Sequence, residues 1–144
     1  MSNAPTPPEW RPLKASGLME AIGPLQAKRK GDHWVYGLAT DSRHANAIGA
    51  IHGGTLCTLA DQVMSLIAWE AAERQPVVTI HMDTTFIASA APGDFLEAEA
   101  RLTARKGSML IVETIVTKAG DEVVRASCIM KAVKPRQREE RHER

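Results

Sequence analysis

The alternation of apolar and polar positions predicts most of the secondary structure of this 144-residue chain. Residues 96–105 (LEAEARLTAR) alternate without a break, which is the period of a strand with one buried and one wet face. The short segment 18–22 stops at Gly23-Pro24 and predicts a short helix. Five further segments are apolar or rich in β-branched residues, lie between turn-forming residues and are predicted as strands: 25–29, 33–40, 77–88, 109–117 and 122–133.

A different pattern covers the segment from Thr55 to Trp69 (TLCTLADQVMSLIAW), where apolar residues recur at helical spacing on most faces. It predicts a long central helix from Gly53 or Gly54 to Glu73, which Pro76 prevents from continuing. The one charged residue within this apolar run is Asp61. Burying an ionised carboxylate without compensation costs on the order of several kcal/mol, so we interpret Asp61 as a functional acid.

The order of these elements predicts the α+β class, with two strands, one long helix and then four strands in a meander. Because consecutive strands are usually antiparallel neighbours, we expect an antiparallel sheet of about six strands curled around the helix. One helix cannot cover both faces of such a sheet, so its outer face stays wet or meets a partner. The domain is expected to span residues 13–134, between a flexible proline-rich tail at 1–12 and a flexible charged tail at 135–144.

The composition argues against nucleic-acid-binding, membrane and metal-binding proteins. Lys and Arg total 18 against 17 for Asp and Glu, which leaves no electrostatic footprint for nucleic acid. No run of about 18 apolar residues and no signal peptide is visible, so we expect a cytoplasmic protein without a membrane partner. Cys57 and Cys128 lie in apolar stretches and are interpreted as small hydrophobes. The five histidines lack the spacing of a zinc helix, and no metal is expected.

The segment Asn46-x-x-Gly49-x-x-His52-Gly53-Gly54 directly precedes the helix that carries Asp61, and Pro92-Gly93-Asp94 follows before the last strands. With this order of elements, the chain resembles the hotdog-fold acyl-CoA thioesterases of the phenylacetate-pathway type over roughly residues 18–134. The resemblance implies hydrolysis of an acyl-CoA, with a medium-chain or aromatic acyl group, to the free acid and CoA. It implies no cofactor apart from the coenzyme A of the substrate.

In that family the thioester lies between two subunits, with its carbonyl facing the start of one long helix and the acid projecting from the other. The resemblance therefore assigns Asp61 as the general base on water or as a nucleophile that forms a mixed anhydride. It assigns the Gly53 backbone N–H as the donor to the thioester oxygen, helped by the helix dipole. Structural alternatives remain open at both positions: an ion pair of Asp61 with Arg43 or Arg105, and a flexible glycine pair entering a helix.

Three other residues correspond to polar positions of the family. Asn46 matches a residue that holds the attacking water or the substrate carbonyl, although an asparagine in a turn before Gly49 fits the local sequence nearly as well. His52 is more often a residue that shapes this loop than a proton carrier. Thr79 falls where related enzymes place a hydroxyl near the acid, but threonine is also simply a good strand former.

The remaining expected contacts are with substrate. The resemblance places an acyl pocket beside the helix and the nucleotide part of CoA near a basic turn, for which a solvated hairpin tip is the structural alternative. The residues expected to bind substrate are Gly54, Met64, Ala68 and Phe86 at the acyl side and Arg105, Lys106, Gly107 and Ser108 at the turn.

Two other functions fit the same motif. One is a hotdog module that binds acyl-CoA without hydrolysing it, and the other is a hydroxyacyl-thioester dehydratase with His52 and Asp61 as its acid–base pair. Whichever holds, an acid and an oxyanion donor from different chains require at least a homodimer with two shared sites. The resemblance implies a homotetramer built as a dimer of dimers.

Overall fold

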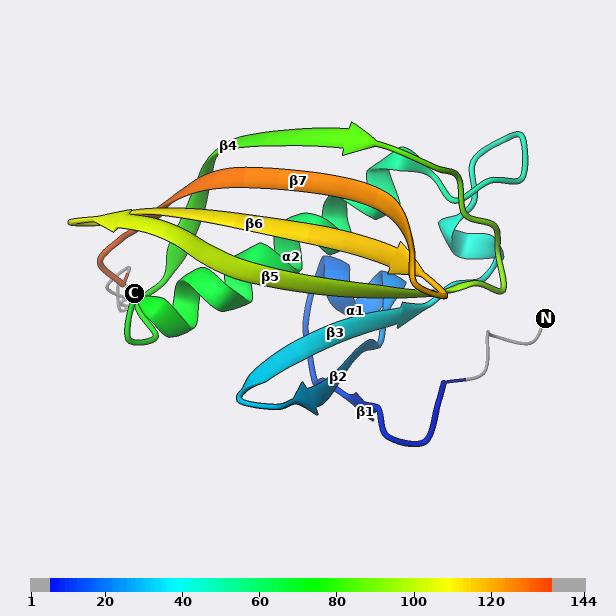
Figure 1. The fold of residues 1–144 in the computed structure, drawn as a ribbon, viewed down its shortest axis with the longest axis horizontal. Helices are drawn as coiled ribbons and strands as arrows, with labels where there is room; N and C mark the ends of the chain where they lie inside the picture. The colour runs from blue at the N-terminus through cyan, green and yellow to red at the C-terminus, as the bar shows by residue number, and fades with distance from the viewer. Residues whose placement is uncertain (1–5, 136–144) are drawn as a thin grey trace, which may run out of the picture.

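The structure is a computed structural model that describes residues 6–135. Its elements follow the predicted order, with an additional two-residue strand at the start and a short 3-10 turn before the long helix (Figure 1). In chain order they are β1 (Arg11–Pro12), α1 (Leu18–Ile22), β2 (Leu25–Lys30), β3 (His33–Ala39), η1 (Ser42–His44), α2 (Gly53–Ala71), β4 (Val77–Phe86), β5 (Phe95–Lys106), β6 (Met109–Lys118) and β7 (Asp121–Ala132).

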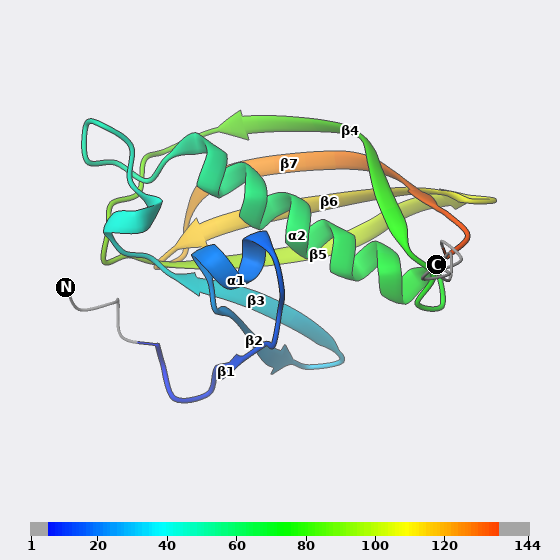
Figure 2. The same cartoon turned by 180° about the vertical axis from the view of Figure 1, so that it is seen from behind.

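All seven strands join one antiparallel sheet in the order β1-β2-β3-β5-β6-β7-β4. The long helix α2 lies across one face of this sheet, as Figures 1 and 2 show from opposite sides. The predicted α+β class and the hotdog arrangement are therefore confirmed. Among the described residues, no helix combines the length and the apolarity that crossing a membrane requires.

The strand order corrects one prediction. Only β5, β6 and β7 form a meander, because β4 pairs with β7 at the far edge of the sheet and β5 pairs with β3. The segment from Ile87 to Asp94 carries the chain back from that edge: the Ile87 N–H donates to Val123 O, and Asp94 O accepts from Thr40 N–H. Consecutive strands are neighbours in roughly two-thirds of cases, and this connection is one of the exceptions.

The N-terminal segment is more ordered than predicted. The indole of Trp10 is buried at 5.1 Å from the ring of Phe95, and the Lys28 ammonium lies 4.7 Å from the Trp10 ring centre. Gly37 makes room for this contact, since a Cβ there would lie 2.4 Å from the Phe95 ring. Residues 10–12 thus belong to the domain rather than to a tail. The rest of the two predicted tails, residues 1–5 and 136–144, lies outside the described residues.

The core lies between α2 and the sheet. Alternate residues of β6 are buried from Leu110 to Val116, whereas β5 buries Leu96 and Ala98 and is exposed towards Lys106. The helix contributes one face, whose buried residues recur three or four apart from Leu56 to Ala68, while its other side chains are partly buried or exposed. Fully buried side chains include Leu59, Val63 and Met64 of α2 and Leu38, Leu96, Leu110, Val112, Val116 and Met130 of the sheet.

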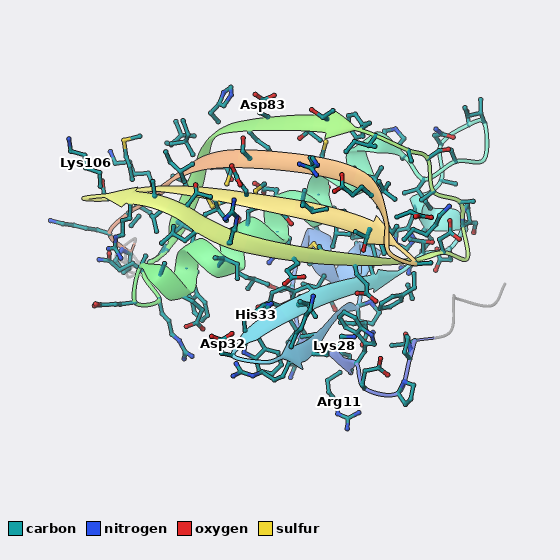
Figure 3. The ribbon with its side chains drawn as sticks, in the orientation of Figure 1. Arg11, Lys28, Asp32, His33, Asp83 and Lys106 are labelled. Carbon is teal, nitrogen blue, oxygen red and sulfur yellow. The ribbon has the colours of Figure 1, made fainter. Side chains whose placement is uncertain are left out.

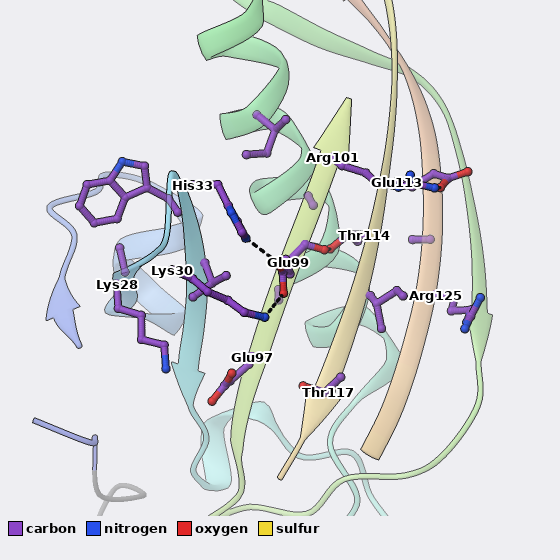
Figure 4. A pocket seen from close by; sticks show the side chains of 18 of the residues that line it. Lys28, Lys30, His33, Glu97, Glu99, Arg101, Glu113, Thr114, Thr117 and Arg125 are labelled. Atoms are coloured by element: carbon purple, nitrogen blue, oxygen red, sulfur yellow. Dashed lines mark hydrogen bonds and ion pairs between the residues drawn. The ribbon is translucent and has the colours of Figure 1, made fainter. Parts of the chain in front are cut away.

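The β2–β3 hairpin separates from β5 towards its tip, because the β3–β5 pairing stops at Tyr36 and Ala98. Glu99 of β5 spans the gap: it accepts from Lys30 Nζ at 3.0 Å and lies 2.6 Å from His33 Nε2 (Figure 4). The hydrogen bond to Glu99, and then that to Asp32, raises the pKa of His33. Although burial works against it, hydrogen bonds from Lys30 and His33 lower the pKa of Glu99.

These shifts predict a pH-dependent contribution to stability. The pKa of His33 is higher in the folded protein than its ordinary value of 6.5. The contribution of His33 to folding stability is therefore complete below pH 6.5 and is lost as the pH rises through the pKa of the folded state. The Glu99 contribution is present above its ordinary 4.5 and is lost as the pH falls through its lowered value. Melting temperatures of the wild type and His33→Gln should therefore differ most between pH 4.5 and pH 6.5, and they should converge at higher pH.

The expected difference is at most about 5 °C, because both side chains are exposed to solvent. Arg101→Gln is the matched control, since Arg101 forms an exposed ion pair with Glu113 that contains no histidine. Its difference from the wild type should stay constant from about pH 6 to about pH 9. A His33→Gln difference that is equally constant over this range would contradict the assignment.

Candidate active site

The first turn of α2 is organised by His52, which is its N-cap. His52 has an extended backbone, its Nδ1 accepts from the Gly54 N–H at 2.7 Å, and its carbonyl accepts from Thr55 N–H and Leu56 N–H. A Cβ at Gly54 would lie 2.9 Å from His52 Nδ1, so glycine leaves room for this cap. Because Nδ1 is an acceptor, the ring proton is on Nε2. His52 thus shapes the helix start.

Gly53, the first residue of the helix, offers a backbone donor. Within residues 6–135 its N–H makes no hydrogen bond, as expected for the first turn of a helix. The ring of Phe86 at the end of β4 lies beside it, since a Cβ at Gly53 would be 3.4 Å from two ring carbons. The structure therefore brings together the predicted oxyanion donor and one of the predicted acyl-contacting residues. A free N–H at the positive end of a helix can bind a developing oxyanion.

Asn46 is used by its own loop. Its side-chain Oδ1 accepts from Ile48 N–H at 3.1 Å and from Ala50 N–H at 3.0 Å, and its backbone carbonyl accepts from Gly49 N–H. Gly49 follows with φ +85°, a conformation that glycine adopts without strain. The turn interpretation of Asn46 is the one that these bonds support. Within the described part of the chain, no hydrogen bond of its side-chain amide N–H groups is seen.

Asp61 and Thr79 form a pair. Thr79 Oγ1 donates to Asp61 Oδ1 at 2.6 Å, and Asp61 is half-buried between α2 and β4. Thr79 is paired with Met130 of β7, just before an irregularity in the β4–β7 register. Paired residues of antiparallel strands lie on the same face of the sheet, and here that face is the one towards the helix. Burial, and then the negative charge of Asp61, raises the pKa of Cys128 to about 11, so that this core thiol stays protonated at neutral pH.

The ion pairs considered for Asp61 do not form within the chain. Arg43 binds the carboxylate of Asp41 instead, with Nε at 3.1 Å from Oδ1. Arg105 donates from Nη1 to the carbonyl of Ala71, at the other end of the helix. The Asp61 carboxylate therefore has a hydroxyl donor and no guanidinium partner among the described residues. The carboxylate is thus not part of an ion pair with either arginine.

Asp61 and Gly53 are not close to each other in one chain. Eight residues separate them along α2, which corresponds to about 12 Å at 1.5 Å per residue. One thioester carbonyl cannot contact both groups across that distance. The chain therefore carries two half-sites, Gly53 with Phe86 at the helix start and Asp61 with Thr79 two turns later.

Two residues expected at the acyl pocket lie elsewhere. Met64 and Ala68 are fully buried in the core between α2 and the sheet, and neither lines a described pocket. Helical spacing alone could not separate the core-facing side of α2 from a pocket wall, because the helix is apolar nearly all round. The structure assigns both residues to packing.

The basic turn is also remote from the helix start. Arg105, Lys106, Gly107 and Ser108 are exposed at the tip of the β5–β6 hairpin, where Arg105 contacts the C-terminal end of α2. Figure 3 shows Lys106 at this end of the molecule. The helix is about 28 Å long, so this turn is far from Gly53 of the same chain.

A large open groove of about 1740 Å³ lies on another part of the molecule (Figure 4). It runs along the gap between the β2–β3 hairpin and β5 and continues over β6 and β7. None of Gly53, Asp61 and Thr79 lines it. The groove and the two half-sites are therefore separate features.

Comparisons with known proteins identify relatives in sequence and in fold. A sequence model described as the thioesterase superfamily matches residues 48–135. A curated relative from Pseudomonas aeruginosa with the name "Putative esterase PA0474" is 33% identical over 99 residues, which cover 67% of this chain and 74% of the relative.

Solved structures show the same fold at lower identity. A hypothetical thioesterase protein of Streptococcus pneumoniae with coenzyme A has a TM-score of 0.70 and 20% identity, covering 78% of this chain and 91% of that chain. A Streptococcus mutans protein bound to acetyl CoA has a TM-score of 0.64 and 24% identity, covering 72% and 82% respectively. A conserved protein of Pseudomonas aeruginosa has a TM-score of 0.75 and 24% identity, covering 83% and 95%.

Proposed function

Because this chain belongs to the thioesterase superfamily, we propose that it hydrolyses an acyl-CoA thioester to the free acid and CoA. The observation that carries the proposal is the Asp61 carboxylate, which lies in an apolar helix with a threonine hydroxyl as its partner and, among residues 6–135, no ion pair with a cation. The coenzyme A and acetyl CoA in the two streptococcal structures support CoA thioesters as the substrate class. A medium-chain or aromatic acyl group is proposed.

In the proposed reaction Asp61 acts on one water molecule. Thr79 occupies Oδ1, so Oδ2 is the oxygen that takes the water proton while the water oxygen bonds to the thioester carbon. The charge that develops on the carbonyl oxygen is bound by the free Gly53 N–H of the other subunit. The carbon–sulfur bond then breaks, and the proton held by Asp61 passes to the CoA sulfur. Direct attack by Asp61, with a mixed anhydride that water later hydrolyses, uses the same groups.

The geometry at His52 favours hydrolysis over dehydration. A dehydratase needs a histidine that exchanges a proton with the substrate, whereas the Nδ1 of His52 is occupied as the cap of α2. Only Nε2 is available to a substrate, and it carries the ring proton because Nδ1 accepts the capping hydrogen bond. His52 is therefore better suited to hold Gly53 and Gly54 in place.

Product identification tests the proposal. The purified protein is incubated with a saturated medium-chain acyl-CoA, an aromatic acyl-CoA and a 3-hydroxyacyl-CoA, and the products are separated by mass spectrometry. We expect free acid and CoA in equal amounts from at least one of them. Conversion of the hydroxyacyl-CoA to its enoyl-CoA would instead identify a dehydratase. Intact acyl-CoA that binds in calorimetry would identify a binding module.

We further propose that the chain works as a homodimer, paired into a homotetramer. β4 is an edge strand whose outer side exposes Val78 and Ile80, the latter 57% exposed. Natural edge strands are usually protected, so an apolar one favours association. Light scattering should give at least twice the 15.7 kDa chain mass, and a species of 15.7 kDa would contradict the shared site.

A further inference from the structure

A buried hydrogen-bonded cluster precedes the loop that leads to α2. Asp41 is the N-cap of the η1 turn and His44 is its last residue, and the two form a reciprocal capping box. Both are buried, with His44 at 0% exposure. The Asp41 carboxylate accepts from the Arg43 N–H at 2.9 Å and from Arg43 Nε at 3.1 Å. Nothing in the periodicity of the sequence marks these residues, because a short polar turn carries no helical or strand pattern.

The imidazole of His44 uses both of its nitrogens. Nδ1 accepts from the Asp41 N–H at 2.9 Å, and Nε2 lies 2.6 Å from the carbonyl of Ile22. Since Nδ1 is the acceptor, the proton lies on Nε2 and is donated to Ile22, which makes the ring a neutral bridge. The bridge joins the η1 turn to the end of α1. A buried ring with both nitrogens bonded holds its own backbone firmly in place.

The backbone carbonyl of His44 then reaches the start of α2. It accepts from the His52 N–H at 2.7 Å and from Thr55 Oγ1 at 3.2 Å. His52 is the N-cap and Thr55 lies in the first turn, so these bonds flank Gly53 on both sides along the chain. Between His44 and His52, residues Ala45 and Ile51 form an isolated antiparallel bridge that closes the loop.

From these contacts we propose that His44 is a positioning residue for the Gly53 N–H. The buried imidazole fixes the His44 carbonyl, the carbonyl fixes His52 and Thr55, and these fix the direction of the free donor between them. Displacement of a catalytic group by about 1 Å can cost on the order of a hundredfold in rate. The effect on rate rests on the proposed function, whereas the effect on the Gly53 amide does not.

Arg43 provides a matched control. Its guanidinium donates to Ala21 O at 2.8 Å and to Gly23 O at 3.1 Å, so it holds the same end of α1 as His44 does. It makes no described contact with His52, Gly53 or Thr55. Replacing Arg43 with glutamine should therefore lower the melting temperature without changing kcat.

Three variants weaken the proposed chain of contacts at different points. Thr55→Val removes one hydroxyl that donates to the His44 carbonyl and keeps the side-chain shape. His44→Asn can keep an acceptor near the Nδ1 position, and His44→Gln can keep a donor near the Nε2 position. Thr55→Val leaves the buried imidazole intact, so it remains informative if the His44 variants fail to fold.

Each variant is measured by kcat, KM, melting temperature and the amide signal of ¹⁵N-labelled Gly53 in the full-length protein. We expect the His44 variants to lower kcat about tenfold or more and Thr55→Val to lower it several-fold, with KM changed less than about threefold. The Gly53 amide should shift or exchange faster with solvent in all three, and Arg43→Gln should leave it as in the wild type.

A purely structural role predicts a different result. The His44 variants and Thr55→Val would then behave like Arg43→Gln, with a lower melting temperature but an unchanged kcat and an unchanged Gly53 signal, and the proposal would be overturned. If the wild type turns over no acyl-CoA, the proposed function fails by itself. The Gly53 signal still decides between a positioning and a packing role for His44 in that case.

Discussion

Replacing Asp61 with asparagine is expected to lower kcat for acyl-CoA hydrolysis at least about a hundredfold, on the order of 3 kcal/mol of transition-state stabilisation. The amide has nearly the shape of the carboxylate and can still accept from Thr79 at the position of Oδ1, but it cannot take a proton from water. KM should change little, because the carboxylate acts on the reacting atoms rather than on the CoA. Steady-state release of CoA thiol measures both constants.

Thr79→Val is the control for this experiment. It removes the hydroxyl that donates to Asp61 and leaves the carboxylate in place, so kcat should fall less than in Asp61→Asn, by about tenfold. Melting temperatures of both variants should stay close to that of the wild type, because Asp61 and Thr79 are not fully buried. An Asp61→Asn protein with the wild-type kcat would remove Asp61 from the mechanism.

Replacing Met64 with alanine is expected to lower the free energy of unfolding by about 2–5 kcal/mol. Met64 is 0% exposed and packs in the core of α2 and the sheet, so its loss leaves a cavity. Phe86, which was predicted to line the same pocket, is 53% exposed. Phe86→Ala should cost less than about 1 kcal/mol, and urea denaturation measures both.

The comparison separates a packing residue from a pocket residue. A Met64→Ala protein with wild-type stability but a changed preference for acyl chain length would show that this side chain lines a substrate pocket. The structure predicts the reverse pattern, in which stability falls and the acyl preference stays. Phe86→Ala should change the acyl preference, because its ring lies beside Gly53.

The fold was largely predictable from local patterns. The unbroken alternation at residues 96–105 and the apolar run after Gly54 each imply one kind of element, and α2 and β5 lie where they were predicted. The position of β4 at the edge beside β7 could not be predicted, because it depends on pairing between residues about 45 apart in sequence. Residues 10–12 were missed because proline-rich sequence hides the buried Trp10.

The candidate site was predictable only where a charged residue interrupts an apolar segment. Asp61 stands out as one charge in an apolar helix, and the structure places Thr79 against it. The N-cap role of His52 was not predicted, since Ser, Thr, Asp and Asn are the usual capping residues. The anchor at His44 depends on contacts with Ile22 and Thr55 from other elements, and no local pattern in the sequence indicates them.

Release of free CoA thiol by the wild-type protein, measured against a panel of short, medium, long and aromatic acyl-CoAs, tests the central claim most directly. The account predicts repeated turnover of at least one of them, with kcat reduced at least about a hundredfold in Asp61→Asn measured alongside. No thiol release from any acyl-CoA, with the same compounds bound intact by the folded protein, would contradict it and leave a binding module in its place.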